Sequence, residues 1–216
     1  MHFSISTLIY TLPAVLVALT VHEFAHGYVS SRMGDPTPRM EGRLSLNPLA
    51  HLDVIGTLCL LLVGFGWAKP VSVNPYYYRD PKKGMAVVAL AGPMTNFVTA
   101  FVALFVYGLC VYFMPERFWQ VPAVLYLINL LEYVALIDIG LGVFNLIPIP
   151  PLDGSKVLGA FLPEDLYMNL MRYEAYGQLL LLALLYFDFL NAPLYHLRNG
   201  VLEGMIFLIN LFLGLF

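Results

Sequence analysis

Residues 4–31 read SISTLIYTLPAVLVALTVHEFAHGYVSS, and this stretch decides where the chain can fold. It is long enough to cross a bilayer, because a spanning helix needs about 20 mostly apolar residues. All of its histidine and acidic side chains lie in one pentapeptide, His22-Glu23-Phe24-Ala25-His26. Such groups are costly inside a membrane helix and usually mark a functional site. The stretch therefore predicts a transmembrane helix that carries chemistry near its C-terminal end.

The composition of the whole chain agrees with a membrane location. Hydrophobic residues make up 60% of the 216 residues and charged residues only 12%, and the mean hydropathy is +0.77. Soluble domains contain about 45–50% apolar and about 25% charged residues. These values exclude a soluble domain and a disordered chain, and the net charge of −3 excludes a basic nucleic-acid binder. We therefore expect contacts with membrane lipid and none with nucleic acid. Cys59 and Cys110 lie in apolar runs, so we interpret them as buried apolar residues rather than as a redox or metal pair.

Further apolar stretches predict how often the chain crosses the membrane. Four more of them qualify as spans, at residues 84–114, 121–147, 175–190 and 200–216. The stretch 54–65 is shorter, and apolar segments of about 10–14 residues are more often re-entrant than spanning. We expect an all-α polytopic membrane protein with five transmembrane helices and one re-entrant segment, or six helices if residues 54–65 span. One integral-membrane domain covers residues 1–216, and we expect no soluble domain beside it.

The basic residues predict the orientation of these helices. Cytoplasmic loops carry an excess of Lys and Arg. With five crossings, only Arg117 and Arg198 fall on one side, and the other nine basic residues share the opposite side: Arg32, Arg39, Arg43, Lys69, Arg79, Lys82, Lys83, Lys156 and Arg172. We therefore predict a multi-pass protein of the cell membrane whose loop after the first helix is cytoplasmic.

The pentapeptide has the spacing of a metal site. Two histidines at positions i and i+4 share one helix face, so His22 and His26 can reach the same ion. Glu23 is placed to take a proton from a metal-bound water. The alternative is that these are interior polar residues satisfied by neighbouring helices. The cost of placing them in one turn of a membrane helix favours the metal interpretation.

A third ligand has to come from elsewhere in the chain. The candidates are His2, His51, His196, Asp53, Asp138, Asp153 and Glu132. Asp153 follows a proline-rich stretch that cannot stay helical, and irregular backbone at membrane depth is tolerated where it lines a polar cavity. The predicted topology also brings Asp153 to the same membrane face as the two histidines. The alternative is an Asp that caps a turn before a helix. Two imidazoles and one carboxylate suit Zn2+.

Together these residues make the chain resemble the site-2 protease family of intramembrane zinc metalloproteases, in its compact bacterial form without PDZ or CBS domains. The resemblance rests on five segments, which are His22–His26, Gly42–Pro48, Gly66–Val71, Ala91–Asn96 and Asn145–Gly154. It implies a zinc metalloendopeptidase with His22, His26 and Asp153 as metal ligands and Glu23 as general base. It also places Asn96 and Asn145 in the active site, where an amide can donate to the oxyanion or hold the substrate backbone. For Asn96 the alternative is a hydrogen bond between packed helices.

The resemblance also implies a substrate class. It would be a single-pass membrane protein already trimmed outside, of the anti-sigma factor or remnant signal peptide type, cut in regulated intramembrane proteolysis with release of product to the cytoplasm. Residues 64–78 suggest a small membrane-embedded β-hairpin that accepts the substrate as an added strand, or else an irregular loop that seals the site. We interpret Asp138 and Glu132 as ordinary buried polar residues rather than as acids that tune the site.

Two other functions stay open at this point. A metal-binding membrane transporter would use the same histidine pair, but few further His or acidic residues are available to build a polar path. A non-catalytic relative would bind membrane segments without cutting them, and the intact Glu23 argues against it. The sequence indicates no oligomeric state.

Overall fold

The computed structural model describes residues 5–56, 59 and 66–214 of the chain. Within these ranges the regular structure is helical, and no β-strand is formed. The longer helices are α1 (Ile5–Arg32), α4 (Pro81–Phe113), α5 (Pro122–Asn145), α8 (Glu174–Tyr186) and α9 (Asn191–Leu213). The shorter ones are α2 (Thr37–Met40), η1 (Pro48–Ala50), η2 (Pro75–Tyr77), η3 (Glu116–Gln120), α6 (Asp153–Gly159) and α7 (Glu164–Arg172).

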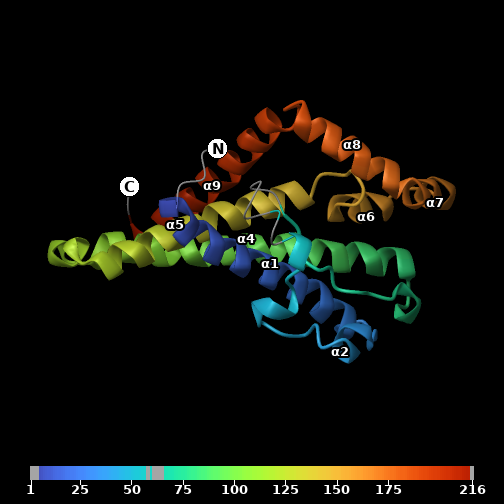
Figure 1. The fold of residues 1–216 in the computed structure, drawn as a ribbon, viewed down its shortest axis with the longest axis horizontal. Coiled ribbons are helices and arrows are strands. Elements are labelled where there is room, and N and C mark those ends of the chain that lie inside the picture. Colours follow the sequence, from blue (N-terminus) through green and yellow to red (C-terminus); the bar gives the residue numbers. More distant parts are fainter. Residues whose placement is uncertain (1–4, 57–58, 60–65, 215–216) are drawn as a thin grey trace.

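Three long helices form the body of the protein. Helix α4 packs against both α1 and α5, and α1 also packs against α5 (Figure 1). Their contact surfaces include the buried alanines Ala14, Ala100, Ala103 and Ala135 beside larger apolar side chains. Small residues let helix backbones approach closely where lipid provides no hydrophobic drive for association. This close packing brings side chains of α1, α4 and α5 within hydrogen-bonding distance of one another.

The number of membrane-spanning helices differs from the prediction. Three described helices are long and apolar enough to span, namely Thr7–Arg32 in α1, α4 and α5. Helices α8 and α9 pass the same test only together, and they are bent by 87° at their junction. The described residues thus form three spans, or four if the bent pair is one span, and five crossings are not confirmed.

Helix α8 is too short to span by itself, and the chain bends where it ends. Helix α8 has 13 residues, which is about 20 Å at 1.5 Å per residue and shorter than the hydrocarbon core of about 30 Å. Beyond it Asp188 has a positive φ of 60°. An L-residue rarely adopts this left-handed conformation, and it cannot continue a right-handed helix. The two predicted crossings at 175–190 and 200–216 therefore join into one elbow. Its α9 arm packs against α4 and α5, whereas the bend between α8 and α9 projects away from them (Figure 1).

The predicted β-hairpin near residues 64–78 is not seen in the described part of that segment. The antiparallel pairing there is one isolated bridge between Leu52 and Ala68. Most of the predicted re-entrant segment, 57–58 and 60–65, lies outside the described residues. Residues 69–74, which we call the tethered segment, form no helix or strand. Pro70 lacks the N–H that a strand ladder requires, so side chains take the place of a partner strand.

Three buried or partly buried side chains hold the tethered segment. The Arg43 guanidinium donates to the Pro70 carbonyl at 2.8 Å. The Val71 N–H donates to Glu23 Oε2 at 2.9 Å, and the Asn74 N–H donates to Asp35 Oδ2 at 2.7 Å. Two of these side chains come from α1 or the turn directly after it. The segment is therefore fixed against the end of α1 that carries the histidines.

Asp35 is the most connected of these three groups. It also accepts hydrogen bonds from Ser30 Oγ at 2.7 Å and from the Thr37 N–H at 2.9 Å. Burial acts to raise the pKa of the Asp35 carboxyl group, but its hydrogen bonds to Thr37, Asn74 and Ser30 outweigh burial and lower the pKa below 3.8. The ionised carboxylate therefore stabilises the connection between α1 and the tethered segment.

Candidate metal centre

The centre begins with the two histidines of α1. His22 and His26 are one helical turn apart, and their ring centroids lie 4.6 Å from each other. His26 Nδ1 donates to the Val88 carbonyl of α4 at 2.7 Å. His22 Nδ1 lies 2.6 Å from Asn96 Oδ1, also on α4. Both acceptors are carbonyl oxygens, so each Nδ1 carries the hydrogen and each Nε2 keeps its lone pair for a ligand.

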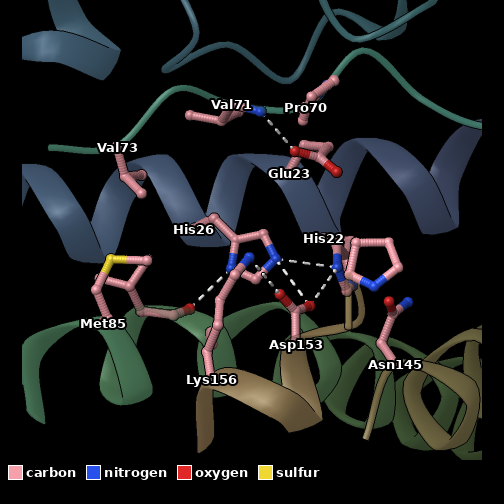
Figure 2. A pocket seen from close by; sticks show the side chains of 13 residues that line it. His22, Glu23, His26, Pro70, Val71, Val73, Met85, Asn145, Asp153 and Lys156 are labelled. Carbon is pink, nitrogen blue, oxygen red and sulfur yellow. Dashed lines mark hydrogen bonds and ion pairs between the residues drawn. The ribbon is translucent and has the colours of Figure 1, made fainter. Parts of the chain in front are cut away.

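Asp153 completes the group from the opposite side. Its Oδ2 lies 3.1 Å from His22 Nε2 and 3.2 Å from His26 Nε2. The two Nε2 atoms are 3.0 Å apart. All three side chains are buried, and these atoms form the one group of at least three potential ligands found among the described residues. Figure 2 shows His22 and His26 pointing towards Asp153.

Asp153 reaches this position because the chain turns sharply after α5. Helix α5 ends at Asn145, and Asp153 is the first residue of α6. The intervening prolines prevent the helix from continuing. A Cβ atom on Gly154 would overlap the backbone of Leu146 and Ile147. Only glycine allows α6 to begin this close to the end of α5.

These side chains fit zinc. A catalytic zinc site has three protein ligands from nitrogen, sulfur or oxygen donors and one open position. Here two imidazole nitrogens and one carboxylate oxygen converge, and the imidazoles are oriented by hydrogen bonds from Nδ1, as zinc-bound histidines usually are. Binding of a metal requires the Asp153 carboxyl group in its ionised form and both imidazoles in their neutral form.

The open side of the group faces a cavity of about 180 Å³. Its lining includes Glu23, Asn145 and Lys156 beside the three converging side chains. Lys156 is three residues after Asp153 on α6, and its Nζ lies 3.7 Å from Asp153 Oδ1. A larger and mainly apolar cavity of about 510 Å³ shares His22, Glu23 and Asn145 with the first. Water and a substrate therefore have space beside the ligand atoms.

Of the three predicted catalytic residues, two line the cavity and one lies behind the metal ligands. Glu23 and Asn145 line the cavity, and Glu23 points towards the Val71 N–H (Figure 2). Asn145 donates from Nδ2 to the Leu141 carbonyl at 3.1 Å. Asn96 is fully buried and is absent from the residues that line the cavity. It lies behind His22 and contacts the ring nitrogen that faces away from Asp153.

Among the described residues, none of the remaining candidates from the sequence joins the group. Glu132 is exposed, so its interpretation as a buried polar residue is wrong. His51 is buried, and its Nε2 donates to the Ser45 carbonyl at 2.7 Å. His196 lies in α9 at 5.7 Å from the Tyr195 ring. Asp138 is buried in α5 and contacts Asn96 rather than the ligand atoms. His2 lies outside the described residues.

Gly92 of α4 is a site residue that the sequence did not single out for this role. A Cβ atom there would lie 2.6 Å from atoms of both the His22 and the His26 rings. Real Cβ contacts are not this short, so the two rings occupy space that only glycine leaves free. The Ala91-Gly92 pair near Asn96 indicated close helix packing, but it did not indicate that His22 and His26 pack against Gly92.

Comparison with known proteins identifies the family. Residues 111–185 match the model of peptidase family M50. That range contains Asp153 but not the two histidines. The Bacillus subtilis protein YwhC is 32% identical over 187 residues, which are 85% of this chain and 83% of that protein. The chain belongs to this family, the site-2 proteases.

Other site-2 protease relatives cover a similar part of the chain. Rip2 of Mycolicibacterium smegmatis is 30% identical over 82% of this chain and 66% of its own length. MJ0611 of Methanocaldococcus jannaschii is 32% identical over 73% of each chain. These two proteins and YwhC all bear the name "Putative zinc metalloprotease". No solved structure matches the chain. The family and the donor set agree that Zn2+ is the cofactor of this membrane protein.

Proposed function

We propose that the protein is an intramembrane zinc metalloprotease, which hydrolyses a peptide bond within or near the transmembrane segment of a single-pass membrane protein. The observation that supports this best is the convergence of His22, His26 and Asp153 beside a cavity that also contains Glu23. Three of these four residues, His22, Glu23 and His26, come from an apolar helix long enough to span a membrane. A hydrolytic site built there can reach bonds that soluble proteases do not.

Each residue would have a distinct task. His22, His26 and Asp153 would hold the zinc ion. When bound, zinc supplies Lewis acidity that polarises the scissile carbonyl and lowers the pKa of a water molecule. Glu23 would accept the proton of that water, since its carboxylate lines the same cavity as His22 and is held at Oε2 by the Val71 N–H. Asn145, at the cavity wall, would donate to the developing oxyanion or to the substrate backbone.

The tethered segment is our candidate for the substrate-binding edge. Its residues Val71 and Val73 line the cavity next to the metal ligands. A substrate helix has to unwind before its backbone is open to water, and an extended peptide can add to a neighbouring extended segment. Val73→Pro should therefore reduce cleavage while zinc binding persists. Unchanged cleavage in this variant would contradict the assignment.

We place the active site near the cytoplasmic side of the cell membrane. Nine of the eleven basic residues lie between the end of α1 and the first turn of α4 or between α5 and α8, and such residues favour the cytoplasm. Cleavage there would release product to the cytoplasm. Substrates of the anti-sigma factor or remnant signal peptide type suit a site that receives a helix from the bilayer.

A cleavage assay tests this function. Purified protein is incubated with a quenched transmembrane peptide, with and without a chelator, and the products are identified by mass spectrometry. Glu23→Gln is the matched variant, because it keeps the shape of the side chain and all three ligands. We expect cleavage to be lost with the chelator and to fall by about 10²–10⁴-fold in Glu23→Gln, the usual contribution of a general base. Zinc bound by a wild-type protein that cleaves no transmembrane substrate would instead indicate a transporter or a non-catalytic binder.

A further inference from the structure

Asp138 is an acidic side chain in the middle of a candidate membrane span. It lies in α5, and none of its surface is exposed. An acidic group at such a position is costly and is retained where it has a specific partner. Its Oδ1 accepts a hydrogen bond of 2.6 Å from Asn96 Nδ2, whereas Oδ2 has no partner among the described residues. The hydrogen bond to Asn96 is thus the main contact that offsets the cost of burying Asp138, and Asn96 in turn contacts the metal centre.

Asn96 connects Asp138 to a metal ligand. Its Nδ2 group donates both to Asp138 Oδ1 and to the Ala18 carbonyl at 3.0 Å. Two acceptors on one side of the amide leave its Oδ1 to face His22 Nδ1 at 2.6 Å. The orientation of the amide is therefore determined by its neighbours, because the reversed amide would point its carbonyl oxygen at two other acceptors.

The orientation of Asn96 in turn determines the state of His22. An oxygen that can only accept requires the hydrogen of the neutral imidazole to be on Nδ1. The lone pair is then on Nε2, the atom that faces His26 and Asp153. In His26 the hydrogen is likewise on Nδ1, because this atom faces the backbone carbonyl of Val88. The two histidines are thus oriented by different means, one by the α4 backbone and the other by a chain of side chains across α1, α4 and α5.

We propose that Asp138 is a positioning residue of the zinc centre, which acts through Asn96 to hold His22 in its ligating tautomer and orientation. This inference rests on His22 being a zinc ligand, as proposed above. Outer partners of metal-bound histidines usually contribute about 10–100-fold to metal affinity. Loss of the Asp138 acceptor should weaken zinc binding within this range without removing any ligand.

The test measures zinc affinity by competition with a chelator in the full-length protein. Asp138→Leu removes the acceptor at similar size, and Asp138→Asn keeps an acceptor oxygen. We expect the zinc Kd to rise by about 10-fold or more in Asp138→Leu and to change by less than about 3-fold in Asp138→Asn. Ile139→Val, at the fully buried neighbouring position, controls for a general disturbance of α5 packing and should leave the Kd unchanged. If Asp138→Leu does not fold, Asp138→Ala takes its place.

A second comparison separates positioning from a general structural role. In an Asn96→Ala background the connection is already broken, so Asp138→Leu should have little further effect on zinc affinity. The absorption spectrum of the Co2+-substituted protein should change in Asp138→Leu and not in Ile139→Val. A wild-type Kd in Asp138→Leu, or the same loss in both backgrounds, would overturn the inference. If His22→Ala also left zinc binding unchanged, the proposed ligand set itself would be wrong.

Discussion

The metal centre and the elbow formed by α8, α9 and residues 187–190 use polar groups in opposite ways. In the centre, His22 is only 4% exposed and Asn96 is fully buried, and both have short hydrogen bonds to groups on neighbouring helices. In the elbow, Asp188 and Asn191 are exposed and bond to each other at 2.5 Å, three residues apart. The centre is thus held by contacts between helices, whereas the polar contact of the elbow is local.

This difference leads to a general expectation. Substitutions at the centre should change zinc binding, because each buried polar group there has a partner that would be left unpaired. Substitutions in the elbow should change stability slightly and leave zinc binding alone. Matched pairs of variants, one from each region, can test this contrast.

The largest contrast should come from the histidines. His26→Ala removes a ligand, so we expect zinc binding and peptide cleavage to fall to background. His196→Ala removes an exposed histidine of α9, and we expect both properties to stay at the wild-type level. Metal content after dialysis and the cleavage rate are the measurements. Equal losses in the two variants would remove the distinction between the regions.

Glycine variants should show a smaller contrast. Gly92→Ala places a Cβ atom 2.6 Å from both imidazole rings, so we expect the zinc Kd to rise by about 10–100-fold as the rings are displaced. Gly200→Ala in α9 meets no atom within 4 Å and should leave the Kd unchanged. Chelator competition measures both constants. A normal Kd for Gly92→Ala would mean that α4 does not lie this close to the histidines.

Asp35 should give a pH-dependent effect on stability. Its pKa is lowered in the folded protein, so its ionised form contributes stability at pH values above 3.8, and this contribution is lost as the pH falls through the folded pKa. We expect Asp35→Asn to lower the Tm at pH 7 and the difference from wild type to shrink below pH 3.8. Thermal unfolding in detergent at several pH values measures this. A difference that is constant with pH would contradict the role of the charge.

The smallest effect should come from the elbow. Asp188 has a positive φ that glycine adopts without cost. Asp188→Gly relieves this strain but removes the bond to Asn191, so we expect the free energy of unfolding to change by no more than about 1 kcal/mol. Zinc affinity should remain unchanged. A large fall in zinc affinity would show that the elbow and the centre are coupled.

The sequence predicted the three converging residues but not the contacts that orient them. Helical spacing is enough to place His22 and His26 on one face, and prolines are enough to end the preceding helix before Asp153. The hydrogen-bond partners of Nδ1 in His22 and His26 depend on the register of α4 against α1, and no local sequence pattern determines that register. The same holds for Asn96, whose position behind His22 follows from contacts on three helices.

The elbow and the tethered segment show a second limit. Residues 175–190 and 200–216 have the composition of two spans, yet the bend depends on the backbone conformation near Asp188. The alternation of Val71-Ser72-Val73 suggested a strand, but the segment is held by side chains of Arg43, Glu23 and Asp35 instead. Composition indicates which segments lie in a membrane. The contacts that a segment makes there depend on residues distant in the sequence.

A zinc titration of the metal-free protein tests the central claim most directly. Cleavage of a transmembrane peptide is followed as zinc is added to the wild type and to Asp153→Ala. We predict that the wild-type rate rises in proportion to zinc and reaches a plateau at one ion per chain, whereas Asp153→Ala stays at background. Cleavage without zinc, or the same titration curve for Asp153→Ala, would contradict a single catalytic zinc held by His22, His26 and Asp153.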